Sequence, residues 1–369
     1  MNRRQLLIGG GAAAAIGAGA VYGGKVRMGS SSDYDAAVAA VRGPLPDPAQ
    51  TLDLVRYATL AANSHNTQPW LFRASPNAIR IEPDRSRRTP VVDPDDHHLY
   101  TSLGCAAENL AIAAARIGQA GELTFAPAGG GSIVFSHRPS AAVTSPLFDA
   151  IARRQSTRTE YDRRIPSAAD LGTLTSAATV PGVELLLITD RPQIDRIRDL
   201  VVAGNSAQFA DPAFIRELKQ WLRFSPRYAL AKGDGLYSAT TGNAALPEWL
   251  GSLALEWFVS ADSENDRYAR QMRSSAGVAV FVGERADPEH WLKVGQACQR
   301  FALQATALGI KHAFINQPVE VAAVRPDLAK LLGMPGRRPD IVMRFGYGPA
   351  MPFSARRPAH EVIIGSRAS

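Results

Sequence analysis

The sequence contains very little cysteine. Its 369 residues include two, Cys105 and Cys298, and neither belongs to a CxxC pair or to another metal-binding spacing. This excludes a framework of several disulfides and a cysteine-based metal centre. One disulfide could form in an exported chain, but nothing in the spacing requires it. We expect both residues to be small members of the core.

The sequence also lacks any run in which basic and aromatic residues alternate, a pattern found on nucleic-acid-binding surfaces. Lys and Arg number 41 against 34 Asp and Glu, a net charge of +7, and the arginines are scattered. We therefore expect a solvated, mildly basic surface and no nucleic-acid partner. With 46% hydrophobic and 20% charged residues the composition is globular, and the length allows two ordinary domains or one large two-lobed one.

No charged residue occurs from Leu6 to Gly24, where a short apolar segment precedes a run of Gly and Ala. Arg3 and Arg4 stand before it, and residues 18–20 form an Ala-Gly-Ala cleavage option, an order that resembles a twin-arginine export signal. We expect residues 1–24 to be such a signal, cleaved or retained, read by the twin-arginine export machinery, and the protein to be extracytoplasmic or membrane-tethered. The alternative is an uncleaved anchor, because residues 6–24 barely suffice to span a bilayer.

Two stretches of the chain share one helical pattern. Apolar residues alternate at spacings of three and four, and glycines fall at equivalent places, which predicts one apolar stripe on each of two matching helices. The matching positions are Tyr100, Leu103, Gly104, Ala107, Leu110, Ala114, Ile117 and Gly118, and Trp291, Val294, Gly295, Cys298, Phe301, Ala305, Leu308 and Gly309. The match predicts an internal duplication, so that the protein resembles a fused dimer.

The rest of the pattern predicts an α+β or sandwich-like α/β fold with helices on a mixed sheet. Residues 205–273 have no counterpart in the first half, and we expect an inserted helical excursion or lid there. The glycines at 129–131 are expected to form a hairpin loop. Predicted helices cover 52–63, 100–117, 147–154 and 291–308, and predicted strands cover 71–72, 78–81, 123–125, 133–135, 183–188, 278–282, 312–315 and 341–345.

Two short motifs point to a family. The string S-x-N-x-Q-P-W at 64–70 follows one predicted helix, and R-x-S-x-R at 154–158 follows another. Together with the glycine-bearing helix at 291–308 and the arginine pair at 356–357, they resemble the signature segments of the FMN-dependent nitroreductase superfamily. The resemblance covers most of residues 50–125 and 150–360, and it implies a nitroreductase-type fold with FMN as cofactor.

The order of the two motifs is reversed relative to that superfamily. There, R-x-S-x-R precedes S-x-N-x-Q-P-W in one chain, and each flavin lies between two chains. Here the first half keeps only the second motif and the second half only the first, so one complete flavin site is expected, assembled within one chain. This pattern resembles the internally duplicated, Acg-like branch. We expect repeats at 25–150 and 151–369, and a monomer in place of a dimer.

The resemblance also implies roles for individual residues. Arginine forms bidentate contacts to phosphate, and a serine hydroxyl can donate a hydrogen bond to phosphate or ribityl oxygens. Arg158 would lie near the N1/O2 edge of the flavin, where a cation favours the reduced anion. The predicted cofactor-binding residues are Arg154 and Arg357 at the phosphate, Ser156, Arg158, Ser64, Asn66 and Gln68, and the backbone of Ile315, Asn316 and Gln317 facing N5 and O4. The chemistry would take place on the flavin, so no catalytic side chain is assigned.

One acidic and histidine-rich segment, Asp93 to His98, could be interpreted as a metal site. Because it directly precedes a predicted helix, we interpret its carboxylates as partners of the helix dipole and expect no metal. His65, inside the flavin turn, is expected either to touch substrate or to be a plain turn residue.

Two functions are compatible with these observations. In the first, a nitroreductase-like oxidoreductase passes electrons through FMN from a donor such as NAD(P)H to a nitroaromatic, a quinone or a similar small acceptor. In the second, the protein binds FMN under a cover formed by residues 205–273 and stores or sequesters it. The colour of the purified protein, and its bleaching by NADPH, would distinguish them.

Overall fold

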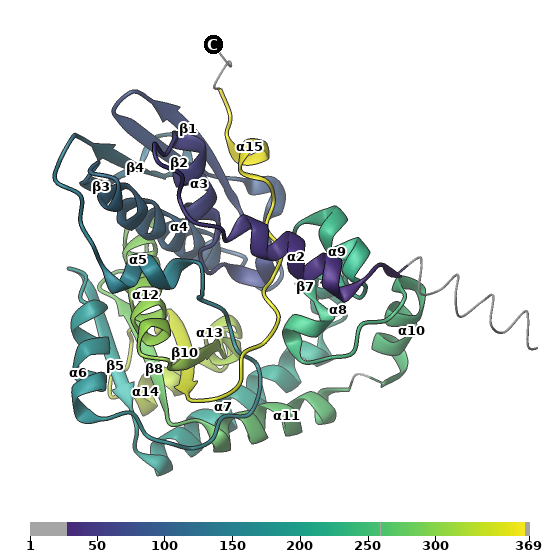
Figure 1. The fold of residues 1–369 in the computed structure, drawn as a ribbon. Helices are drawn as coiled ribbons and strands as arrows, with labels where there is room; N and C mark the ends of the chain where they lie inside the picture. Colours follow the sequence, from purple (N-terminus) through teal and green to yellow (C-terminus); the bar gives the residue numbers. More distant parts are fainter. Residues whose placement is uncertain (1–27, 259, 366–369) are drawn as a thin grey trace, which may run out of the picture.

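The computed structural model describes residues 28–258 and 260–365, with two four-stranded sheets and two long helices between them (Figure 1). The predicted export signal at 1–24 lies outside the described residues. The first sheet contains β1 (Trp70–Ser75), β2 (Ala78–Pro83), β3 (Gly121–Ala126) and β4 (Ser132–His137). The second contains β5 (Val183–Ile188), β8 (Gly277–Gly283), β9 (Lys311–Phe314) and β10 (Ile341–Gly346).

The two sheets have the same topology, which confirms the predicted duplication. The strand order is β1-β2-β4-β3 in one and β5-β8-β10-β9 in the other, and a long helix follows the second strand of each. These helices are α4 (His97–Arg116) and α12 (Pro288–Ala307). A shorter helix precedes the first strand of each sheet, α3 (Thr51–Thr59) in the first and α6 (Ala168–Ala177) in the second. The chain is therefore two copies of one α+β unit.

The predicted mixed sheet is wrong. Every pairing within the two four-stranded sheets is antiparallel, for example Trp70 with Pro83 and Val183 with Gly283. In the first sheet a tight turn at 76–77 joins β1 to β2, which requires antiparallel strands. The only parallel ladder in the described residues is the two-residue pair β6 (Leu222–Arg223) and β7 (Leu236–Tyr237), outside both sheets.

Glycines set the distance between α4 and α12. A Cβ atom on Gly104 would lie 2.0 Å from the carbonyl oxygen of Leu292, and one on Gly295 would lie 2.1 Å from that of Thr101. Gly104 and Gly295 are equivalent in the repeat, and so are Thr101 and Leu292. The two close approaches are therefore related by a pseudo-twofold axis, and neither helix could come this near with a larger residue.

Polar contacts between the same helices obey the same symmetry. Arg300 Nη1 lies 2.8 Å from Glu108 Oε1, and Gln299 Nε2 donates to Asn109 Oδ1 at 2.7 Å. Glu108 is equivalent to Gln299, and Asn109 to Arg300, so each pair is the image of the other. One image is ionic and the other uses neutral amides. The neutral image lies on the side of the turn that follows α3, because Gln299 also accepts from the N–H of Ala62.

The two sheets differ in how they are covered. In β8 and β10 every residue is buried, because α12 and α6 pack on one face and α7 (Arg191–Ala210) and α14 (Arg325–Leu331) on the other. β2, by contrast, alternates buried and partly exposed residues, as a one-sided sheet requires. The unbroken apolar run at 277–283 and the alternating run at 78–83 reflect this difference.

The connection between β5 and β8 forms the excursion. It occupies residues 189–276, where the first repeat has only the turn at 76–77, and it contains the predicted segment 205–273. Figure 1 shows its short helices gathered at one side of the molecule, beyond both sheets. After α7 its helices are α8 (Pro212–Trp221), α9 (Pro226–Lys232), α10 (Glu248–Phe258) and α11 (Ala261–Ser274).

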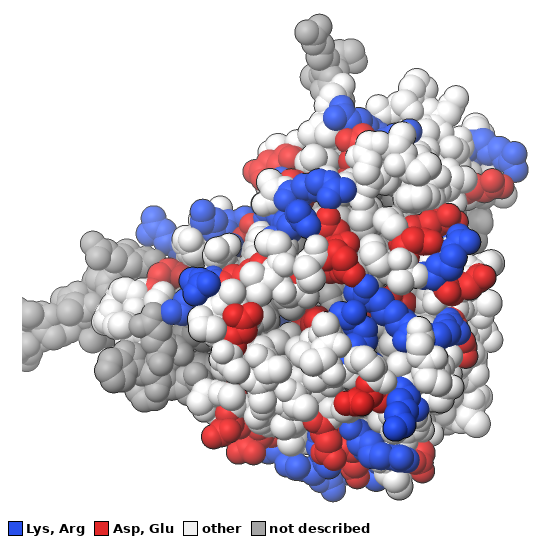
Figure 2. Space-filling model, turned by 180° about the vertical axis from the view of Figure 1, so that it is seen from behind, with Lys and Arg blue, Asp and Glu red and all other residues white. Residues whose placement is uncertain are grey.

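The remaining α-helices of the described chain are α2 (Ser31–Val41), α5 (Pro146–Ile151), α13 (Gln317–Glu320) and α15 (Ala359–Val362). The C-terminal segment returns to the first repeat, where Ile363 bridges to Phe72 of β1. No helix in the described part of the chain is both long and apolar enough to cross a bilayer. Acidic and basic side chains are intermixed on the face shown in Figure 2.

Candidate functional site

The turn at 64–68 has an unusual backbone. His65, Asn66 and Gln68 have positive φ angles of 47°, 53° and 53°, and they are three of the five non-glycine residues with positive φ in the described chain. Such angles are costly for residues with a Cβ and persist only where surrounding contacts fix them. Their concentration in one turn marks it as a candidate functional element.

Two side chains fix this turn to distant segments. Asn66 Nδ2 donates to the carbonyls of Gly235 and Ala355 at 3.0 and 3.1 Å. Gln68 Nε2 donates to Gly233 at 2.8 Å, and its Oε1 accepts from the N–H of Arg357 at 2.9 Å. The turn therefore joins the first repeat to the excursion and to the C-terminal segment. Both amides are used within the protein, which differs from the cofactor contacts that the motif implied.

Next to this turn lies a small recess of about 40 Å³ with four arginines and no carboxylate among its lining residues. The arginines are Arg42, Arg154, Arg158 and Arg356. They come from α2, from the R-x-S-x-R motif and from the C-terminal segment. Ser156 lines the recess as well. An enclosed group of cations without a counter-ion is suited to bind an anion such as a phosphate.

Burial lowers the pKa of all four arginines, in Arg42 to about 10, and Arg154 adds to the effect at both Arg42 and Arg356. Arg154 is the least satisfied of them. Its Nη2 donates to Leu60 at 3.1 Å, but its Nε and Nη1 are buried without a partner. Arg356, in contrast, donates to five carbonyls and to Asn66 Oδ1. Among the arginines of the recess, the buried nitrogens without a partner are therefore Nε and Nη1 of Arg154 and Nε of Arg42.

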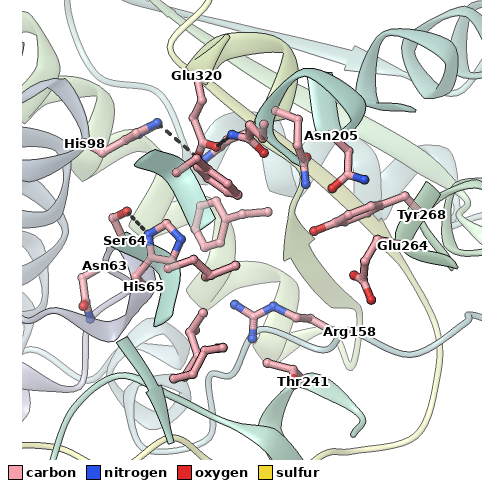
Figure 3. A pocket seen from close by; sticks show the side chains of 18 of the residues that line it. Asn63, Ser64, His65, His98, Arg158, Asn205, Thr241, Glu264, Tyr268 and Glu320 are labelled. Atoms are coloured by element: carbon pink, nitrogen blue, oxygen red, sulfur yellow. Dashed lines mark hydrogen bonds and ion pairs between the residues drawn. The ribbon is translucent and has the colours of Figure 1, made fainter. Parts of the chain in front are cut away.

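The recess adjoins a larger cavity of about 430 Å³, and Ala62, Asn63, Arg158 and Leu236 line both. This volume is in the range of small-molecule sites. More than half of the lining residues come from the excursion, and many of these are apolar, such as Phe209, Phe214 and Phe224. Figure 3 shows Arg158, His65 and Tyr268 pointing into the space from different sides.

Polar groups are concentrated on one wall of the cavity. His98 Nε2 lies 3.6 Å from Glu320 Oε1, and Gln208 Nε2 donates to Glu320 Oε2 at 2.6 Å. Burial raises the pKa of Glu320 to about 7 and lowers those of His98 and His65, the latter to about 4. Burial thus favours the neutral form of all three side chains. Gln317 Oε1, in the same cavity, is buried without a partner.

The structure brings together most, but not all, of the predicted site residues. Arg154, Ser156, Asn66 and Arg158 line the recess, and Ser64, Asn316, Gln317 and again Arg158 line the cavity. Gln68, Ile315 and Arg357 line neither. Ile315 belongs to the core behind the second sheet, and Arg357 lies 3.7 Å from Asp84. The placement of Arg357 at a phosphate is not supported, since its neighbour Arg356 occupies the recess.

Sequence reasoning missed Arg42 and the cavity wall formed by His98, Gln208 and Glu320. Arg42 lies at the C-terminal end of α2, in a stretch that carries no motif. His98 belongs to the segment considered for a metal. There Asp93 accepts from the N–H groups of His98 and Leu99 at 2.9 and 3.0 Å, which agrees with its interpretation as a partner of the helix N-terminus. No group of three metal-ligating side chains occurs among the described residues.

Both cysteines are buried free thiols, in agreement with their expected core role. They lie on α4 and α12 and also line the cavity. Cys105 Sγ donates to the carbonyl of Gly295 at 3.2 Å, at the close approach of the two helices. Burial and the neighbouring Cys105 raise the pKa of Cys298.

Comparison with known proteins identifies the family. A model described as "Nitroreductase family" matches residues 151–348, more than half of the chain. The chain belongs to the nitroreductase family. The match contains the R-x-S-x-R motif, the excursion and the whole second sheet. It confirms the family that the two motifs predicted.

Two relatives from Mycobacterium tuberculosis H37Rv align over most of the chain. Rv3131, provisionally named an NAD(P)H nitroreductase, is 24% identical over 341 residues, 88% of this chain and 94% of its own. The protein acg, with the same provisional name, is 25% identical over 340 residues, 86% of this chain and 98% of its own. Similarity to acg over both repeats confirms the predicted Acg-like branch.

Solved nitroreductases show weaker similarity. A nitroreductase with bound FMN from Bacteroides fragilis is 17% identical with a TM-score of 0.35, covering 56% of this chain and 90% of its own. The FMN-dependent nitroreductase NfnB from Mycobacterium smegmatis, solved with NADPH, is 13% identical with a TM-score of 0.37. The match covers 55% of this chain and 87% of NfnB.

Proposed function

We propose that the protein is an FMN-dependent, nitroreductase-like oxidoreductase with one flavin site per chain. The observation that carries the proposal is the carboxylate-free recess of four arginines opening onto an apolar cavity. A flavin mononucleotide has the same two parts, an anionic phosphate and a flat aromatic ring. The buried, partnerless Nε and Nη1 of Arg154 are donors that such a phosphate would satisfy.

The residues present fit this cofactor. Arg154 and Ser156 would contact the phosphate, while Arg42 and Arg356 would supply positive potential around it. Arg158, which lines both spaces, would lie along the ring edge, and Ser64, Asn316 and Gln317 would face the ring compartment. When bound, FMN would supply two-electron hydride chemistry. The apolar walls of the excursion would exclude water from the acceptor.

The names of the relatives and the lining of the cavity together suggest the substrates. Rv3131 and acg carry NAD(P)H nitroreductase names, and NfnB was solved with NADPH, so we propose a nicotinamide donor. Phe209, Phe214 and Phe224 offer aromatic and apolar surface to a flat acceptor. A nitroaromatic or a quinone has this shape, with polar oxygens at its rim that the cavity's polar wall could contact.

A second candidate is flavin storage or sequestration with little turnover. It is favoured by the large share of the cavity wall that the excursion provides, because this cover could keep a nicotinamide away from the ring. The two functions share the same flavin site and differ only in access. They are therefore distinguished by reduction and not by binding.

Purified protein loaded with FMN tests the proposal. Under argon, NADPH should bleach the flavin absorbance, and addition of menadione should restore it with one equivalent of menadione consumed per flavin. Dithionite serves as the control for a reducible flavin. Bleaching by dithionite but not by NADPH or NADH would favour sequestration, and failure to bind FMN would contradict both candidates.

We also propose export by the twin-arginine route. The support is the leader with Arg3 and Arg4, and the fact that this route carries folded proteins, which could already hold their cofactor. Replacing both arginines by lysine should leave flavin-loaded protein in the cytoplasm. Normal export of that variant would indicate a general secretory signal or an anchor.

A further inference from the structure

One wall of the cavity holds a carboxyl group that the flavin site does not use. Glu320 closes the short helix α13, and its side chain is 14% exposed. Its polar contacts are Gln208 Nε2 at 2.6 Å and His98 Nε2 at 3.6 Å. Figure 3 shows Glu320 and His98 on the wall of the same space into which Arg158 and Tyr268 point.

The groups around Glu320 favour its protonated form. Asp93, before α4, and Glu217, on α8, are nearby carboxylates that raise its pKa further. Within the described residues, no arginine forms an ion pair with Glu320. Arg325, on the following helix α14, donates its Nε to the carbonyl of Val319 at 2.7 Å. Tyr268 faces it from α11, and burial raises the pKa of that phenol. A carboxylic acid held neutral beside an apolar cavity is a common arrangement for a general acid.

We propose that Glu320 is the proton donor to the electron acceptor bound in this cavity, with His98 and Gln208 as positioning residues. The inference rests on the proposed oxidoreductase function and deepens it. It also narrows the acceptor to a class whose oxygen must gain a proton, such as a quinone or a nitro compound.

The step balances with the groups already named. A quinone takes a hydride from the reduced cofactor, with both electrons, and must gain one proton at an oxygen to become a hydroquinone. The O–H bond of Glu320 breaks, its proton forms the new O–H bond of the acceptor, and the electron pair remains on the carboxylate. Water then returns a proton to Glu320, so that the residue is unchanged after each turnover.

A purely structural role is the alternative, in which Glu320 only anchors α13 to Gln208 of α7. Glutamine at position 320 would keep the shape and a hydrogen bond to position 208 but would supply no acidic proton. Glu264 is the matched control, since it lines the same cavity, yet it is ion-paired with Arg267. The comparison of E320Q with E264Q therefore separates proton donation from a general loss of a cavity carboxylate.

The first test follows the oxidation of the photoreduced, FMN-loaded protein by menadione in stopped flow between pH 5 and 9. For the wild type and E264Q, the rate should fall as pH rises through about 7, because the acid form of Glu320 is lost. For E320Q, we expect a rate about a hundredfold lower at pH 6 and no such pH dependence. FMN affinity should stay within about twofold in both variants.

The second test needs neither flavin nor turnover. Infrared spectra of the FMN-free protein should contain a carboxylic-acid band that titrates near pH 7, is present in E264Q and is absent in E320Q. A wild-type rate profile retained by E320Q, or a band unaffected by the substitution, would overturn this inference alone. A wild-type protein that binds no FMN or does not reduce menadione would overturn the proposed function and this inference with it, even if the infrared band titrates as expected.

Discussion

Arg154 has a buried charge that the protein does not fully satisfy. Two of its three guanidinium nitrogens lack partners, and the surrounding recess contributes three more arginines and no carboxylate. Burying charge without compensation is unfavourable, so the ligand-free protein is destabilised at this point. An anion would relieve that cost and gain charge-assisted hydrogen bonds at once. The recess thus favours the binding of an anion at the expense of the stability of the ligand-free protein.

The substitution Arg154→Met tests this at the residue scale. It removes two donors to the phosphate, and each hydrogen bond to a charged group contributes about 1.5–3 kcal/mol, so FMN affinity should fall by about a hundredfold or more. The melting temperature of the FMN-free protein should rise, because a buried, unpaired charge is lost. Fluorescence titration and differential scanning fluorimetry measure the two effects.

Two arginines serve as controls for that experiment. Arg153→Met makes the same change at the exposed neighbouring position and should leave both quantities almost unchanged. Arg357→Met tests the placement that the sequence suggested and the structure does not support. If FMN affinity falls with Arg357→Met and not with Arg154→Met, the phosphate lies elsewhere than in the recess.

Single residues were the hardest to predict from the sequence. The two motifs located the turn and the recess, because their residue types are specific. The roles of Asn66 and Gln68 could not be inferred, because their partners at 233–235 and 355–357 are distant in the sequence. Arg42 and Arg356 reach the recess from the two ends of the described chain. No local sequence pattern predicts that two residues so distant in the sequence lie close together in the fold.

At the scale of elements, the packing of α4 against α12 depends on two glycines. Each stands where a Cβ would overlap a backbone carbonyl of the other helix, and backbone cannot move aside as a flexible side chain can. The helices form the centre of the molecule, and both cysteines lie on them. Their separation therefore also sets the position of one wall of the cavity.

Gly104→Ala should destabilise the protein by about 3 kcal/mol or more, because the added methyl group forces α4 and α12 apart. Gly172→Ala is the control. Gly172 lies inside α6 with nothing within 4 Å of its Cβ position, so alanine there should stabilise the protein by about 0.5–1 kcal/mol. Urea unfolding of both variants gives the two free energies. Equal effects would mean that the helices do not depend on this close approach.

Elements were predicted well where burial is periodic. The matching helices followed from residue spacing alone, since a helix repeats every 3.6 residues, whereas the strand at 183–188 was predicted from its apolar composition. The direction of the strands could not be predicted in the same way. An apolar run such as 277–283 has the same composition in a parallel and in an antiparallel sheet when both faces are covered. The antiparallel direction is set by the segments that connect the strands.

As a whole, the molecule contains two repeats in one chain, arranged like the two subunits of a dimer. The recess and the cavity do not follow this symmetry. The turn after α3 carries the strained S-x-N-x-Q-P-W backbone, whereas at the end of α6 the carbonyl of Ala177 accepts from Arg300 at 2.6 Å. The excursion adds a wall only beside the first of these turns. The two repeats therefore share one scaffold, and residues of both of them line the recess.

This asymmetry predicts one FMN per chain and a monomer. The surface that would join two subunits is already used between α4 and α12, so the loaded protein should sediment near 39.5 kDa for the full chain, less any cleaved leader. Flavin released by heat should equal the protein in molar amount, and Arg154→Met should reduce it to near zero. A ratio near two in the wild type, falling to one in the variant, would reveal a second working site in the other half. An obligate dimer would instead mean that the chains associate through another face of the molecule, because the contact between α4 and α12 lies within one chain.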